Sequence, residues 1–149
     1  MSEAEILEKD IHVDSGEFPR HMDIDLSNKC NLRCRFCHLS FHEPEKWTQL
    51  SYDQFLKIAP VFGKMESITL FSKYEPLTCR DFIPIFDKIC EYDIETYFST
   101  NGILLDDDII DALVGRLTYL TVSVTGFTRE SYIKNMGQNR LEKVRENLA

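Results

Sequence analysis

The chain has 149 residues, the length of one ordinary domain, and its apolar fraction of 43% is enough for a buried core. Its net charge of −8 argues against nonspecific nucleic-acid binding, because a phosphate backbone binds a positive surface. The apolar stretches are far shorter than the roughly 20 residues of a membrane span, and the acidic residues 1–5 lack the features of a signal peptide. We therefore expect a cytoplasmic protein with no nucleic-acid or membrane partner.

Hydrophobic periodicity predicts alternating strands and helices after a polar lead-in at residues 1–18. The predicted strands run from Met22 to Leu26, Ser67 to Phe71, Glu95 to Ser99 and Tyr119 to Val124. The predicted helices run from Ser51 to Phe62, from Thr78 to Tyr92, from Asp106 to Val114, and from Thr128 onward with a break near Gly137. Four consecutive βα units imply parallel strands joined by right-handed crossovers. The predicted fold is an α/β sheet or partial (β/α) barrel over residues 19–149.

Local signals mark some of the helix ends. Ser51 with Gln54 three residues later has the pattern of a capping box. Pro60 is expected to kink or shorten the helix that contains it, because proline has no N–H to donate. The last predicted helix reaches Ala149 without a terminating Gly or Pro. We therefore expect the chain to be a fragment of a longer protein.

Three of the five cysteines form a CxxxCxxC spacing, Cys30, Cys34 and Cys37, directly after the first predicted strand. An odd cysteine count without a secretory signal is poor support for disulfides, whereas thiolates are good ligands for iron–sulfur clusters or zinc. Electron-carrying clusters usually take four cysteines, so three would leave one iron open to another ligand. Arg33 and Arg35 are expected to lower the pKa of these thiols and to offset the charge of a cluster.

The remaining ligating side chains allow an alternative. His38 or His42 could complete a zinc site with the three cysteines. Cys90 lies in the apolar stripe of its predicted helix and is expected to be a core residue. Cys79, at a predicted helix start, is also expected to be small and buried rather than functional.

The cysteine loop resembles that of the radical S-adenosylmethionine (radical SAM) enzymes, in which an aromatic residue precedes the last cysteine. Cys30, Cys34, Phe36 and Cys37 match this motif position by position. The resemblance implies that the three thiolates hold a four-iron four-sulfur (4Fe-4S) cluster whose open iron is chelated by S-adenosylmethionine, with Phe36 beside the adenine. It extends over roughly residues 22–148 and implies four units of a (β/α)6 barrel.

Three further motifs are similar to motifs of that family. Glu75, followed by Pro76, resembles the Gly-Gly-Glu-Pro motif, which implies that the carboxylate accepts hydrogen bonds from the cofactor's ammonium group. Lys73 and Tyr74 stand in place of the two glycines, where side chains would crowd a close backbone approach. Asn101, in a Thr-Asn-Gly turn, is expected to line the cofactor pocket.

The fourth motif lies at the end of the last predicted strand. Ser123 is the candidate contact to the cofactor's ribose or carboxylate, the alternative being a hydroxyl that faces water or a helix. Thr125 stands where the family commonly has aspartate. All four motifs follow the carboxyl ends of predicted strands, where ligands of parallel α/β folds bind.

The resemblance implies an enzyme that cleaves S-adenosylmethionine reductively and uses the 5′-deoxyadenosyl radical to remove a hydrogen atom from a substrate. A reductant such as flavodoxin or ferredoxin would supply the electron, and peptide-maturing relatives suggest a peptide substrate. No acid or base is needed for the first step, so we assign no catalytic residue.

Two other classes of protein compete with this interpretation. The first is a non-catalytic iron–sulfur or zinc-binding module derived from a truncated radical SAM domain. The second is a ferredoxin-like electron carrier, which the repeated βα pattern and the lack of a fourth clustered cysteine oppose.

Overall fold

The computed structural model describes residues 18–71 and 73–149, so the predicted lead-in lies outside the described residues except for Phe18. One four-stranded sheet has the order β1 (His21–Asp23), β2 (Ser67–Thr69), β3 (Glu95–Thr100) and β4 (Tyr119–Val122). Every neighbouring pair is parallel, with Met22 opposite Ile68 and Phe98 opposite Leu120. The predicted α/β fold with parallel strands is confirmed, as an open sheet that does not close into a barrel.

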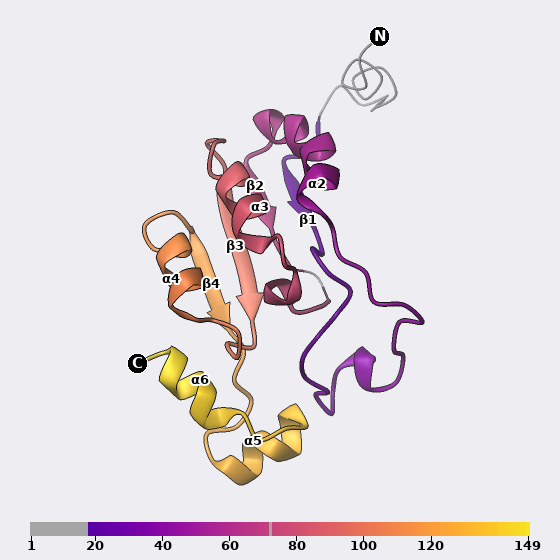
Figure 1. Cartoon of the computed structure of the whole chain (residues 1–149), viewed down its shortest axis with the longest axis vertical. Coiled ribbons are helices and arrows are strands. Elements are labelled where there is room, and N and C mark those ends of the chain that lie inside the picture. Colours follow the sequence, from indigo (N-terminus) through magenta and orange to yellow (C-terminus); the bar gives the residue numbers. More distant parts are fainter. Residues whose placement is uncertain (1–17, 72) are drawn as a thin grey trace.

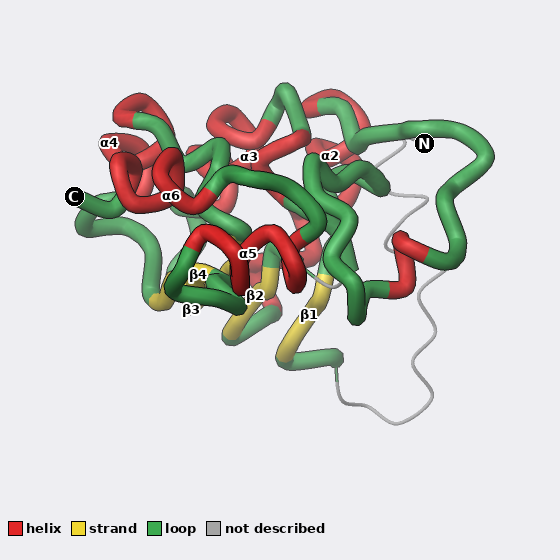
Figure 2. The backbone as a smooth tube through the Cα atoms, turned by 90° about the horizontal axis from the view of Figure 1, so that it is seen from below, coloured by secondary structure: helices red, strands yellow, loops and turns green. Residues whose placement is uncertain are grey.

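Three helices cover one face of this sheet, as Figures 1 and 2 show. They are α2 (Tyr52–Ile58), α3 (Phe82–Ile89) and α4 (Asp107–Leu113). Side chains alternate across a strand, so Phe98 of β3 is buried under these helices while Glu95 at its start is exposed. The largest fully buried side chains of this core include Phe55, Phe62, Phe82, Phe86, Ile68 and Ile85.

The opposite face of the sheet carries polar side chains, and no described helix covers it (Figure 2). Its side chains include His21, Asp23, Thr69, Tyr97, Ser99 and Thr121. Parallel sheets are usually covered on both faces, so this polar face is an unusual feature of the described fold. Of the helices that the structure describes, none has the length and apolar character needed to cross a bilayer.

The ends of α2 follow the local sequence. The Ser51 hydroxyl accepts a hydrogen bond from Gln54 N–H (3.2 Å), and the Gln54 side chain accepts one from Ser51 N–H (3.0 Å), so the predicted capping box is confirmed. The α-helix ends at Ile58 and continues as a 3-10 helix, η2 (Ala59–Lys64), because Pro60 cannot donate. A single helix to Phe62 was therefore too long a prediction, while the effect of Pro60 is confirmed.

Three other predicted boundaries are wrong by three or four residues: the end of the first strand, and both ends of the helix predicted from Thr78 to Tyr92, which runs from Phe82 to Ile89. The first strand ends at Asp23, because the chain then turns and Leu26 accepts a hydrogen bond from Leu50 N–H (2.8 Å) while Ser27 forms an antiparallel bridge with Gln49. The predicted helix from Thr78 begins only at Phe82, since Pro76–Thr78 form a separate 3-10 turn, η3.

The last two helices, α5 (Arg129–Met136) and α6 (Leu141–Asn147), lie at the carboxyl edge of the sheet (Figure 1). Gly137 ends α5 with φ +80°, which confirms the predicted break. These helices enclose a second small core of Leu32, Tyr132, Met136, Leu141 and Val144, with Cys30 and Cys34 packed against it. The cysteine loop is thereby held against the C-terminal part of the chain.

Candidate cofactor site

The three motif cysteines lie in the loop between β1 and α2, and all three thiols are free and partly buried. A turn in which Cys37 N–H donates to the Cys34 carbonyl (2.9 Å) leads into the 3-10 helix η1 (His38–Ser40). Across residues 18–71 and 73–149, no three His, Cys, Asp or Glu side chains converge closely enough to hold one metal ion. The three thiols nevertheless lie near one another, because Cys34 interacts electrostatically with both Cys30 and Cys37. Each iron of a 4Fe-4S cluster takes its own cysteine, so three neighbouring thiols on one loop are a donor set that suits a cluster.

The pKa values of two motif thiols are raised, not lowered. Burial raises the pKa of Cys34 to about 11, and the neighbouring cysteines add to the effect. Burial also raises the pKa of Cys30, and the opposing effect of Arg33 is the smallest of its causes. Arg33 does lower the pKa of Cys30 as predicted, but burial outweighs it and the net shift is upward. Neither Arg33 nor Arg35 is among the causes of the Cys34 shift, so for Cys34 the predicted lowering is wrong. Both thiols are protonated at neutral pH, and a bound metal ion would displace the proton.

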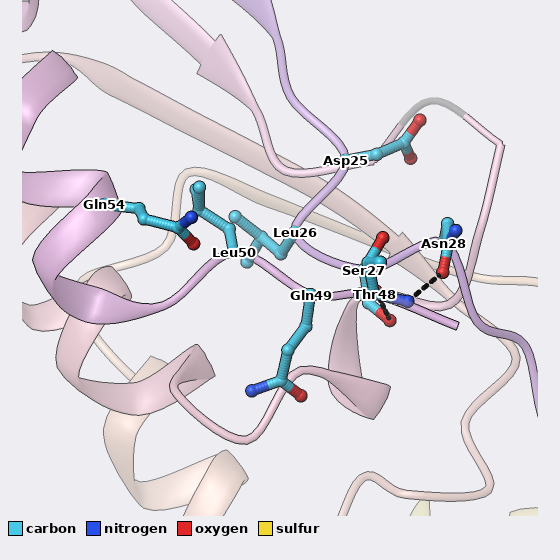
Figure 3. Close-up of a pocket in the computed structure, with 8 residues that line it drawn as sticks. All are labelled: Asp25, Leu26, Ser27, Asn28, Thr48, Gln49, Leu50 and Gln54. Atoms are coloured by element: carbon cyan, nitrogen blue, oxygen red, sulfur yellow. Dashed lines mark hydrogen bonds between the residues drawn. The ribbon is translucent and has the colours of Figure 1, made fainter. Parts of the chain in front are cut away.

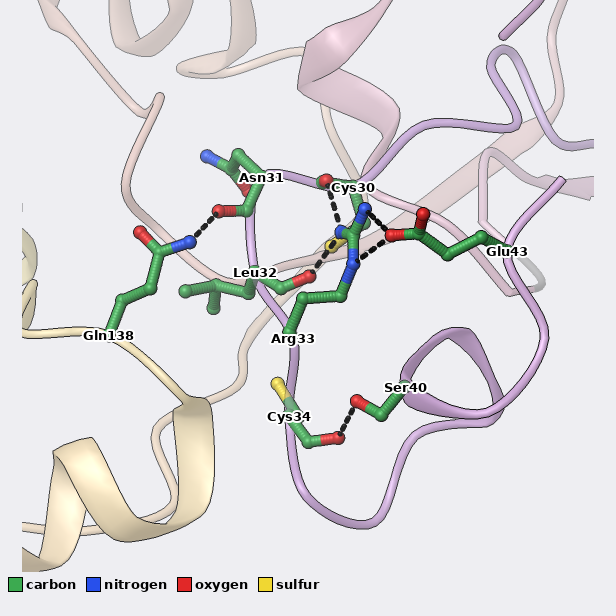
Figure 4. A network of polar contacts seen from close by, with 8 residues as sticks. All are labelled: Cys30, Asn31, Leu32, Arg33, Cys34, Ser40, Glu43 and Gln138. Carbon is green, nitrogen blue, oxygen red and sulfur yellow. Dashed lines mark hydrogen bonds and ion pairs between the residues drawn. The ribbon is translucent and has the colours of Figure 1, made fainter. Parts of the chain in front are cut away.

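Arg33 instead braces the cysteine loop, as Figure 4 shows. Its guanidinium donates to the carbonyls of Cys30 (3.0 Å) and Leu32 (2.8 Å) and to the carboxylate of Glu43 (2.6 Å). The same group lies 5.6 Å from the ring centroid of Trp47. Arg33 therefore ties the motif to the segment that follows η1.

The C-terminal helices hold the other side of the loop. Gln138 donates to the Asn31 carbonyl (3.0 Å; Figure 4), and Arg35 N–H donates to the carbonyl of Asn135 (2.9 Å). A Cβ added at Gly137 would lie 2.3 Å from the Arg33 carbonyl oxygen, so only glycine allows this approach. Gln138 and Asn135 could not be predicted as site residues, because no local sequence pattern indicates a contact across about a hundred residues. Gly137 was the one residue of this contact with a sequence signal, as the predicted helix break.

Glu75 lies directly after the loop that follows β2 and is 3% exposed. Its carboxylate accepts hydrogen bonds from the Thr100 hydroxyl (2.7 Å) and from the backbone N–H groups of Asn101 (2.8 Å) and Leu77 (3.3 Å). Its own N–H donates to the carbonyl of Lys29, next to Cys30 (3.1 Å). Burial raises the pKa of the Glu75 carboxyl, and these three hydrogen bonds oppose the shift. Glu75 thus joins the cysteine loop to the end of β3.

Asn101 reaches the cysteine loop from β3. Its side-chain amide donates to the Asn31 side chain (2.7 Å), and its side-chain oxygen accepts from Ile103 N–H (3.1 Å). Asn147 of α6 donates to the carbonyls of Gly102 (2.8 Å) and Ile103 (3.1 Å) and closes over this turn. The structure therefore places Asn101 beside the motif, with its side chain engaged by the protein.

Phe36 and Ser123 are not joined to this arrangement. Phe36 is 65% exposed. The Ser123 hydroxyl is exposed and lies 3.4 Å from that of Ser99, on the uncovered face of the sheet. The Thr125 hydroxyl donates to the sulfur of Met136 (2.8 Å), so it faces the second core. Of the four candidate cofactor residues, the described contacts bring Glu75 and Asn101 to the cysteine loop and leave Phe36 and Ser123 apart.

The residues in place of the two glycines have structural partners. The Tyr74 ring packs edge-on against the His38 ring, with centroids 5.6 Å apart. Lys73 N–H donates to the carboxylate of Asp25 (3.0 Å). Cys79 is buried in the main core, and Cys90 is half-buried against it, as predicted for both.

A separate open depression lies next to the cysteine loop, where residues 25–28 run beside residues 48–54 (Figure 3). Its lining includes the apolar side chains of Leu26 and Leu50 and the polar side chains of Asn28 and Gln49. The Asn28 side-chain oxygen accepts from Thr48 N–H (2.6 Å), which holds the two segments together. None of the motif cysteines lines this depression, so it is not the predicted cofactor site.

Comparison with known proteins identifies the family of the chain. The family model of the radical SAM superfamily matches residues 24–149. A "Probable GTP 3',8-cyclase" of Saccharolobus islandicus is 29% identical over 128 residues, covering 84% of this chain and 41% of the relative. A protein of the same name from Archaeoglobus fulgidus is 28% identical, covering 87% of this chain and 43% of the relative. The chain therefore spans about two fifths of the length of these curated relatives.

Solved structures share the fold. SuiB of Streptococcus suis, bound to its precursor peptide SuiA, has a TM-score of 0.68 and 19% identity, covering 88% of this chain and 30% of SuiB. The enzyme anSMEcpe with bound AdoMet has a TM-score of 0.67 and 21% identity, covering 87% of this chain and 40% of anSMEcpe. At these identities the likeness concerns the fold alone.

Proposed function

Because the chain belongs to the radical SAM superfamily, we propose that it is a radical SAM enzyme, or the N-terminal part of one, that binds a 4Fe-4S cluster through Cys30, Cys34 and Cys37. The observation that carries the proposal is the position of the CxxxCxxC loop, which is tied to Glu75 and Asn101 at the carboxyl edge of a parallel sheet. Residues 19–149 would then be the first four βα units of the core.

When bound, the cluster and S-adenosylmethionine supply the electron transfer and the radical that removes a hydrogen atom from a substrate. The protein's own part is to hold and shield these groups. Cys30 and Cys34, protonated without metal, give up their protons on binding iron. Arg33 keeps the loop carbonyls in place during this exchange.

The four candidate cofactor residues have different support. Glu75 and Asn101 lie beside the cysteine loop, and one lone pair of the buried Glu75 carboxylate remains after its three hydrogen bonds, which suits an ammonium donor. Ser123 lies on the uncovered polar face of the sheet, where a ribose could be reached. Phe36, exposed on the loop itself, is free to lie against an adenine ring.

The relatives bear on the class of substrate. The names of the curated relatives favour GTP, and the SuiB complex favours a peptide, the class that the sequence resemblance suggested. A carrier such as flavodoxin or ferredoxin would deliver the electron. Formation of 5′-deoxyadenosine with GTP or with a peptide library, but not without substrate, would separate the two classes.

The first experiment is anaerobic reconstitution with iron and sulfide, reduction, and electron paramagnetic resonance with and without S-adenosylmethionine. We expect a reduced 4Fe-4S signal that changes when S-adenosylmethionine is added, since the cofactor would bind the open iron. A cluster signal that does not change when S-adenosylmethionine is added would favour a non-catalytic iron–sulfur module. Stoichiometric zinc without a cluster would overturn the proposal.

A further inference from the structure

The hydroxyl of Tyr132 is buried without a hydrogen-bond partner, alone in this respect among the buried side-chain polar atoms of the described residues. The Tyr132 side chain is fully buried in the second core, between the cysteine loop and α6. Leaving a buried hydroxyl unpaired destabilises a folded protein. Phenylalanine would fill the same space without that cost, so the hydroxyl calls for an explanation.

Cys34, one of the proposed cluster ligands, packs against the same core as Tyr132. Met136, four residues after Tyr132 and therefore on the same face of α5, lies with its sulfur 3.7 Å from the Cys34 sulfur. Burial raises the pKa of the Tyr132 phenol, and negative charge at Cys34 adds to this effect. The phenol and the thiol therefore belong to the same small core.

Metal binding would invert the hydrogen-bonding role of Cys34. In the metal-free protein its S–H donates to the Met136 sulfur, which also accepts from the Thr125 hydroxyl. A thiolate ligand has no proton to donate and instead accepts hydrogen bonds. Binding of iron thus leaves a half-buried acceptor at Cys34, which packs against the same core as the unpaired donor on Tyr132.

We infer that the Tyr132 hydroxyl donates a hydrogen bond to the Cys34 sulfur when Cys34 is a cluster ligand, and that it thereby raises the reduction potential of the cluster. The direction follows from charge: reduction adds negative charge to the cluster and its sulfurs, and a hydrogen-bond donor stabilises the more negative state. Tyr132 is then a tuning residue that acts through Cys34. The inference rests on the proposed function.

The test is the midpoint potential of the reconstituted cluster in wild type, Tyr132→Phe and Tyr119→Phe, measured by anaerobic redox titration followed by electron paramagnetic resonance. Tyr119 is the matched control, because it is exposed at the start of β4, the strand end opposite to the site. For Tyr132→Phe we expect a shift to lower potential, up to about tenfold in the reduction equilibrium or about 59 mV for one electron. Tyr119→Phe should keep the wild-type value.

Thermal unfolding of the metal-free proteins separates tuning from a structural role. Tyr132→Phe should unfold at the wild-type temperature or above it, because the hydroxyl has no partner to lose. If the variant fails to hold a cluster at that unchanged stability, the hydroxyl is needed to retain the cluster and does not tune it, which overturns the inference. Lower stability without metal, or an unchanged potential with it, would overturn the inference. Absence of a 4Fe-4S cluster from wild type would overturn the proposed function as well.

Discussion

The carboxylate of Glu75 and the backbone N–H of Asn101 form a 2.8 Å hydrogen bond between the loops that follow β2 and β3. Each residue also reaches the cysteine loop, Glu75 through the Lys29 carbonyl (3.1 Å) and Asn101 through the Asn31 side chain (2.7 Å). Three loops from three strands are thereby joined into one polar unit. Because its central carboxylate is buried, this unit is sensitive to pH.

The first prediction concerns the pH dependence of stability. Burial raises the pKa of folded Glu75 above 4.5, so between that value and the folded pKa the native state binds more protons than the unfolded state. The contribution of Glu75 to the free energy of unfolding therefore falls as pH rises through this interval. Glu75→Gln, a neutral side chain of similar shape, should lack this fall. We expect the stability difference to shift in favour of Glu75→Gln with rising pH, as measured by urea unfolding from pH 4 upward.

A constant difference across that pH range would contradict the raised pKa. Glu45→Gln is the control for the loss of one charge, since Glu45 is an exposed carboxylate outside the polar unit, between η1 and α2.

The second prediction concerns the ligands. Cys34→Ala removes a proposed ligand and should prevent stable assembly of the 4Fe-4S cluster, so that iron, sulfide and the visible absorption of the cluster fall to near background. Cys90→Ala changes a half-buried cysteine outside the motif and should keep the wild-type iron content. Equal iron content in the two variants would be incompatible with ligation by Cys34.

The third prediction concerns the approach of α5 to the cysteine loop. Gly137 has φ +80° and faces the Arg33 carbonyl, so Gly137→Ala should lower the free energy of unfolding by about 1–3 kcal/mol. At Gly63 an added Cβ meets nothing within 4 Å, and Gly63→Ala should change stability by no more than about 0.5 kcal/mol. Urea unfolding of both metal-free variants checks this; equal effects would mean that the close approach at Gly137 is absent in solution.

The fourth prediction concerns Arg33. Lysine keeps the charge of Arg33 but not its planar fork, so Arg33→Lys should lose part of the bracing of the Cys30 and Leu32 carbonyls. We expect a loss of about 1–2 kcal/mol in unfolding free energy and faster release of iron to a chelator. Arg35→Lys is the matched control, because the Arg35 side chain is exposed and the hydrogen bond of Arg35 to Asn135 is made by its backbone N–H. Iron release at the same rate from both variants would argue that the guanidinium does not hold the loop.

The sequence by itself was sufficient for the features that depend on local pattern. The hydrophobic pattern predicted the four strands, and the capping box at Ser51 predicted a helix start. The cysteine spacing indicated the candidate cofactor site. These features could be predicted because the physics behind them acts over a few residues: side-chain period, caps, and the chemistry of thiolates.

Only the tertiary structure decided how the motif is held and how its groups titrate. It separated Leu26 from the first strand by pairing it with Leu50, and it set the partners of Arg33 and Glu75. It also made the predicted lowering of the Cys30 pKa by Arg33 a minor effect, because burial outweighs a charge that is already paired with Glu43. Burial and partners of this kind arise from segments far apart in the chain, so no local pattern encodes them.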